Sequence, residues 1–162
     1  MSVGPARRWY RVAWCLFWVL SLAPSFSHAA APCPEKEFLK NPNAVVDFRD
    51  WEGLYASFCK FGGCDNGGEV SESYSDRIPK LLVERWPELE RLDGRCRKHP
   101  RFRRFVLQHI NASGDAEALE RLAAVSATCP AKARTLCEDI HRQAAQAVAE
   151  INEVTDSAAR VR

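Results

Sequence analysis

The chain lacks the short motifs that mark several large enzyme classes. It contains no G-x-S-x-G nucleophile elbow, no H-E-x-x-H zinc motif and no P-loop, and its acidic glycine-rich segment lacks the EF-hand pattern. It has no C-x-x-C, and His99, His109 and His141 do not stand at the spacing of metal ligands. We therefore predict no cofactor, no metal site and no catalytic residue that spacing singles out.

The sequence also lacks an apolar run long enough to cross a bilayer. The longest run, Val12–Ala23, has 12 residues, which as a helix reach about 18 Å against a hydrocarbon core of about 30 Å. Arg7, Arg8 and Arg11 precede it, and small residues follow at Ser27 and Ala29. This order is typical of a secretory signal peptide over residues 1–29, cleaved after Ala29, rather than of a retained anchor. We expect a periplasmic or secreted protein with no membrane span after cleavage.

Six cysteines remain after residue 29: Cys33, Cys59, Cys64, Cys96, Cys129 and Cys137. An even number in a short exported chain predicts a disulfide framework, although six cysteines can pair in many ways. One pair can be argued from position. Pro130 follows Cys129 directly and breaks the helix, so Cys129 and Cys137 can meet if residues 130–133 form a loop between two helices. The other four cysteines are expected to pair among themselves.

Hydrophobic periodicity is helical almost throughout the rest of the chain. We predict an all-α fold, a disulfide-stapled bundle of five or six helices without a sheet, as a single domain over residues 30–162. The predicted elements are an extended arm over 30–49, helices over 50–61, 71–86, 99–110, 115–128 and 133–157, a short helix from Pro87 that stops at Gly94, and a frayed tail over 158–162. Because Pro79 falls within the second helix, that helix either begins near Asp76 or kinks.

One candidate binding site is a glycine-rich acidic loop. Residues 62–68 hold half of the eight glycines, and residues 47–76 carry seven acidic and two basic side chains. The candidate binding residues here are Asp65, Asn66, Glu69, Glu72 and Tyr74. We expect residues 62–70 to be an exposed connection, because a glycine-rich acidic segment cannot bury its charges without a large desolvation cost. A bound cation is the alternative.

The second candidate site is a basic segment. Residues 91–104 carry seven bases and one acid, and the candidate binding residues are Arg97, Arg101 and Arg104. A nucleic-acid partner is not expected, since the chain after residue 29 holds 20 basic and 21 acidic side chains. An anionic headgroup, a cell-wall polymer or an acidic protein would suit the segment. Alternatively, it forms a solvated face that meets the acidic segment, within one monomer or between monomers as a homo-oligomer.

Several short motifs resemble a family of uncharacterised small exported proteins of proteobacteria. The motifs are Trp51…Tyr55-x-Ser57-Phe58, Gly63-Cys64-Asp65-Asn66-Gly67, Tyr74-Ser75-Asp76, Phe105-Val106-Leu107, Cys129-Pro130 and Leu136-Cys137. The resemblance covers roughly residues 50–140. It implies a bacterial, periplasmic setting and implies no activity.

These observations favour an exported, non-enzymatic binding protein of the cell envelope that holds a protein partner. An inhibitor or immunity-type protein that blocks an envelope enzyme is one form of this hypothesis. The alternative is a small envelope hydrolase that uses Asp65, Glu69 or Glu72 as its acid/base group. Such an enzyme would need a cleft with one of these carboxylates beside it.

Overall fold

The computed structural model describes residues 33–160 except 35–36, 38–39 and 66–67. The predicted signal peptide over 1–29 and the candidate residue Asn66 lie outside the described residues. The α-helices are α2 (Trp51–Phe61), α3 (Glu69–Glu84), α4 (Leu89–Lys98), α5 (Pro100–Gln108), α6 (Ala116–Ser126) and α7 (Arg134–Arg160). Short 3-10 turns are η1 (Pro42–Val45), η2 (Gly62–Cys64), η3 (Trp86–Glu88) and η4 (Ala131–Ala133). No strand occurs in this described part, which confirms the predicted all-α bundle.

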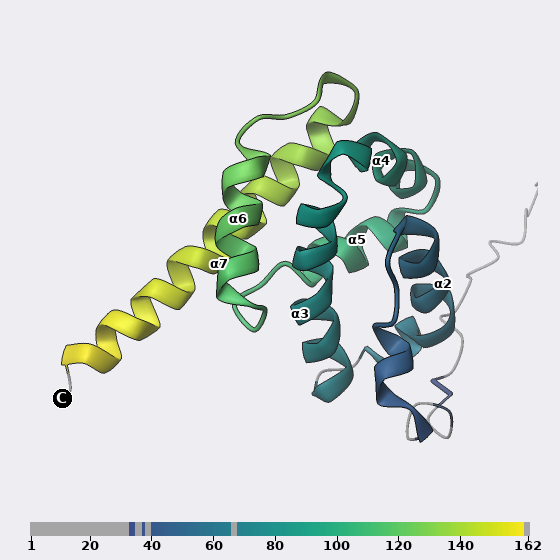
Figure 1. Cartoon of the computed structure of the whole chain (residues 1–162), viewed down its shortest axis with the longest axis horizontal. Helices are drawn as coiled ribbons and strands as arrows, with labels where there is room; N and C mark the ends of the chain where they lie inside the picture. The colour runs from purple at the N-terminus through teal and green to yellow at the C-terminus, as the bar shows by residue number, and fades with distance from the viewer. Residues whose placement is uncertain (1–32, 35–36, 38–39, 66–67, 161–162) are drawn as a thin grey trace, which may run out of the picture.

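The helices surround one apolar core. Helix α6 packs between α3 and α7, while α5 contacts α2, α4 and α7 (Figure 1). Trp51, Tyr74, Phe102 and Leu122 are among the large side chains that the bundle buries completely. No helix in the described ranges is long and apolar enough to cross a membrane.

Two helix starts form as the sequence predicts. Asp50 accepts a hydrogen bond from the Gly53 amide at 2.7 Å, and Asp115 accepts one from the Ala118 amide at 2.8 Å. Each aspartate thereby satisfies one of the amides that a first helical turn leaves without an intrahelical partner.

Other helix boundaries differ from the prediction. Helix α4 continues through Gly94 to Lys98, because burial of Leu92 and Cys96 outweighs the cost of about 1 kcal/mol that glycine adds to a helix. Helix α3 begins at Glu69, two residues before the predicted start at 71, and contains Pro79, which excludes the alternative of a start near Asp76. Helix α7 extends to Arg160, beyond its predicted end.

The disulfide framework is smaller than predicted. Cys129 and Cys137 are bonded with their Cα atoms 5.6 Å apart, which confirms the predicted pair, and η4 supplies the turn that brings them together. Cys33 and Cys64 form the second disulfide. Cys59 and Cys96 are free thiols, so the prediction that all six cysteines pair is wrong. Cys59 is exposed on α2, whereas Cys96 lies in the core on α4, where burial raises the pKa of its thiol to about 12.

The two free thiols should differ in reactivity because Cys59 is exposed and Cys96 is buried. We expect iodoacetamide to alkylate Cys59 in the native protein and Cys96 only after unfolding, because the thiolate is the reactive form and Cys96 is enclosed. Peptide mapping without reductant should show Cys33 linked to Cys64 and Cys129 linked to Cys137. A peptide that links Cys59 to Cys96 would contradict this assignment of paired and free cysteines.

Replacing Cys129 and Cys137 together with alanine should lower the free energy of unfolding by about 2–3 kcal/mol.

Candidate functional site

The acidic loop does not present Asp65 to solvent. The Asp65 side chain is only 7% exposed, and its Oδ2 lies 3.1 Å from Nε2 of His109, whose side chain is 0% exposed. Gln108 Nε2 donates a weaker hydrogen bond to the same oxygen at 3.4 Å. The prediction of a fully exposed loop over 62–70 is therefore wrong at Asp65, and also at Cys64 and Val70, which are buried. The loop can bury this carboxylate because His109 supplies a hydrogen-bond donor inside the protein.

A chain of hydrogen bonds continues from His109 into the core. Ser75 Oγ lies 3.1 Å from His109 Nδ1, and Asn111 Nδ2 donates to Ser75 Oγ at 3.0 Å. Burial lowers the pKa of His109, and this effect outweighs the opposing influence of Asp65. A neutral imidazole fits these two contacts when its Nε2–H donates to Asp65 and its Nδ1 accepts from the Ser75 hydroxyl. We refer to Asp65, His109, Ser75 and Asn111 as the polar chain.

The polar chain contains a serine, a histidine and an aspartate in hydrogen-bond contact, as nucleophilic enzymes do. Burial argues against that role here, because Ser75 is 1% exposed and His109 is fully enclosed. The side chains are therefore placed to hold the fold together rather than to meet a substrate. The sequence also favours a core position for His109, because it lies on the apolar face of the helix predicted over 99–110. Ser75 and Asn111 were not predicted, since nothing in their spacing marks them.

Tyr74 is also part of the interior. Its ring is fully buried and its hydroxyl lies 2.7 Å from Ser57 Oγ, which in turn donates to the Val45 carbonyl. Burial raises the pKa of Tyr74 to about 12. Its assignment as a surface binding residue is wrong, because its phase on α3 points the ring into the core. Ser57 and Lys60 stand at the spacing of an S-x-x-K motif, but Ser57 is buried and Lys60 pairs with Glu37 at the surface.

The remaining acidic candidates, Glu69 and Glu72, are exposed in the first turn of α3. No group of three or more histidine, cysteine, aspartate or glutamate side chains is arranged to hold a metal ion in the described part of the chain.

Much of the basic segment is neutralised within the monomer. Arg91 and Arg95 of α4 reach Glu52 of α2 at 3.5 and 3.2 Å, so the acidic and basic segments meet at this point. Arg97 pairs with Asp93 of its own helix at 3.1 Å, and Arg103 pairs with Asp139 of α7. Arg101 and Arg104 are exposed on α5.

A groove of about 430 Å³ lies at the basic side of α5. Its lining residues come from α5 and α7: Pro100, Arg103, Arg104, Leu107, Gln108 and Gln143. Pro100 and Leu107 supply apolar surface, while the guanidinium and amide groups supply hydrogen-bond donors. Arg104 makes no ion pair with any described residue, unlike Arg103. The groove therefore combines an apolar wall with a positive charge that no acid in the described part of the chain neutralises.

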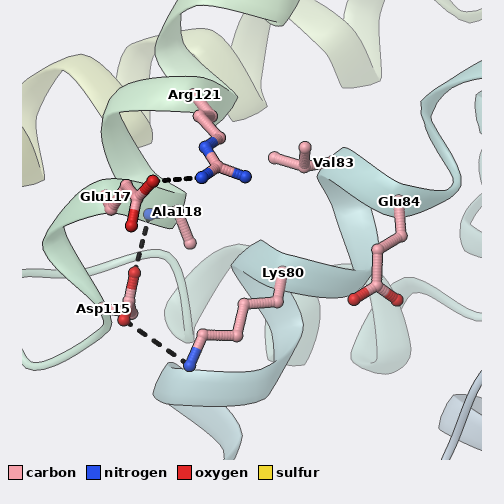
Figure 2. A pocket seen from close by; sticks show the side chains of 7 residues that line it. All are labelled: Lys80, Val83, Glu84, Asp115, Glu117, Ala118 and Arg121. Atoms are coloured by element: carbon pink, nitrogen blue, oxygen red, sulfur yellow. Dashed lines mark hydrogen bonds and ion pairs between the residues drawn. The ribbon is translucent and has the colours of Figure 1, made fainter.

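Two further hollows are lined by charges of both signs. One of about 280 Å³ lies between α3 and α6, where Asp115 contacts Lys80 and Glu117 pairs with Arg121 (Figure 2). The other, of about 400 Å³, lies beside the Cys129–Cys137 disulfide and includes His141, whose Nδ1 contacts the Ala123 carbonyl at 3.2 Å. Because their charges are already paired or mixed, neither hollow favours an ion of one sign.

No family model, curated protein or solved structure matches this chain.

Loss of Asp65 should destabilise the protein more than loss of the exposed acids. Asp65→Ala would leave the buried Nε2–H of His109 without its acceptor, at a cost of about 1–3 kcal/mol. Glu69→Ala and Glu72→Ala, in the solvated first turn of α3, should each cost less than about 1 kcal/mol. Urea unfolding of the three variants measures the difference, and equal losses would show that the polar chain contributes little.

The lowered pKa of His109 predicts acid sensitivity. Below about pH 6.5 the unfolded chain binds a proton at this histidine while the folded protein resists it, so the free energy of unfolding should fall as the pH drops. His109→Gln should be less stable at pH 7.5 but should lose part of this pH dependence. The matched control is His99→Gln, which alters an exposed histidine and should keep the wild-type profile in urea unfolding at pH 7.5 and 5.5.

Proposed function

We propose that the chain is an exported, non-enzymatic binding protein of the cell envelope, and that the α5–α7 groove holds an acidic protein partner. The observation that carries the proposal is the position of Arg104, which pairs with no acid among the described residues and lies beside apolar Leu107 at the edge of a concave surface. Protein interfaces commonly join an apolar centre to arginine in this way. The two disulfides support export, because such bonds persist in oxidising compartments.

A protein partner fits the groove better than a membrane surface. Binding to anionic lipid needs a cluster of several basic side chains close together. Here Glu52, Asp93 and Asp139 pair with four of the seven basic side chains of the segment, which reduces the positive area open to an anionic surface. Carboxylates of a protein partner could meet Arg104, while Gln108 and Gln143 donate to its polar groups. An inhibitor or immunity-type role for such a complex remains part of the proposal.

The hydrolase alternative has less support. Asp65 is committed to His109 in the interior, and neither Glu69 nor Glu72 lines one of the three hollows described above. A general acid or base must reach its substrate within hydrogen-bond distance.

Affinity capture with matched variants tests the binding role. Tagged residues 30–162 should retain a partner from envelope extract at low salt, identified by mass spectrometry. Arg104→Glu should reduce capture at least tenfold, because it reverses the free charge in the groove. Lys132→Glu changes a lysine that is 81% exposed outside the groove, so this control should capture as the wild type does. Equal capture by Arg104→Glu and wild type would contradict the assignment of the groove.

A further inference from the structure

The end of α7 extends past the helix on which it packs. At 1.5 Å per residue, the 27 residues of α7 reach about 40 Å, whereas the 11 residues of α6 reach about 16 Å. Figure 1 shows the C-terminal part of α7 running away from the other helices. Every residue from 152 to 160 is exposed, and we call this segment the overhang.

The overhang is an unusual helix for a solvated segment. Asn152, Thr155, Asp156 and Ser157 all have low helix propensity, so local preference alone explains the helix poorly. The apolar stripe that packs α7 onto the bundle continues through Val148 and Ile151, which are partly buried, to Val154, which is 68% exposed.

The charge of this end is mainly acidic. Glu150, Glu153 and Asp156 are exposed, with Arg160 as the one base among residues 148–160. The end of α7 therefore presents exposed valine between carboxylates, whereas the α5–α7 groove presents leucine and proline beside arginine. The two surfaces are complementary in charge, and both have apolar area to bury.

We propose that the overhang of one copy docks into the α5–α7 groove of a second copy. This proposal rests on the proposed function and names a partner for the same groove. The overhang cannot fold back into its own groove, because α7 itself forms one wall through Gln143. Asn152 lies nine residues further along the same helix, about 13 Å away. Because the two surfaces differ, the contact is head-to-tail and can repeat from copy to copy.

Charge exchange between the two surfaces tests the contact. In sedimentation velocity at low salt, the wild-type chain should show a sedimentation coefficient that rises with protein concentration, and 0.5 M NaCl should suppress the rise. Reversal of groove charge by Arg104→Glu with Gln143→Glu should abolish association, as should Glu153→Arg with Asp156→Arg in the overhang. An equimolar mixture of the two variants should associate again, because each overhang then meets a groove of opposite charge. Val154→Ser, which removes apolar area without changing charge, should weaken association.

Three outcomes would overturn the proposal: a wild-type chain that stays monomeric at low salt, a groove variant that still associates, or a mixture that does not regain association. Circular dichroism of each variant separates misfolding from loss of contact. Failure of this proposal is distinct from failure of the binding role. Capture of an envelope protein that depends on Arg104, by a chain that sediments only as a monomer, would keep the binding role and remove self-association.

Discussion

The buried contact between Asp65 and His109 constrains how the loop, α3 and α5 are arranged. A carboxylate and an imidazole that are both removed from water must satisfy each other, so their positions are tightly constrained. Asp65 follows η2 and adjoins the Cys33–Cys64 disulfide, whereas His109 ends α5, so the contact joins segments 44 residues apart. Ser75 extends the same constraint to α3. One polar chain thereby fixes the loop, α3 and α5 relative to one another.

The same region determines where α6 begins. Because Pro79 has no amide hydrogen, the Ser75 carbonyl has no donor four residues ahead in α3. The connection between α5 and α6 packs against this carbonyl: a Cβ added to Gly114 would lie 2.5 Å from the oxygen, so only glycine fits. Asn111 in the same connection donates to the Ser75 hydroxyl. The direction of α6, and of α7 packed on it, therefore follows from contacts made around Ser75.

The sequence predicts the helices well because their apolar stripes and aspartate caps are local signals. It also predicts the Cys129–Cys137 disulfide, since Pro130 forces a turn over a short separation. The sequence does not predict features that depend on contacts between distant segments, such as the burial of Asp65. Asp65 in its glycine-rich loop looks solvated unless the buried histidine that donates a hydrogen bond to it is known. A count of cysteines likewise does not distinguish the free Cys59 and Cys96 from the paired ones. The sequence names Arg104 as a candidate binding residue but predicts no groove beside it, because Gln143 comes from another helix.

The contacts that acidic side chains make within the monomer determine which charges remain unpaired at its surface. In the acidic segment, Asp65 is buried against His109, and Glu52 forms ion pairs with Arg91 and Arg95 of α4. Asp139 of α7 holds Arg103 in the same way. Arg104, one residue further along α5, lines the groove and pairs with no acid among the described residues. Glu153 and Asp156, which pair with no base among the described residues, lie on the overhang of α7. The basic groove and the acidic overhang therefore lie at two separate places along α7. Because the helix holds them apart, a contact between the two surfaces requires a second copy of the chain.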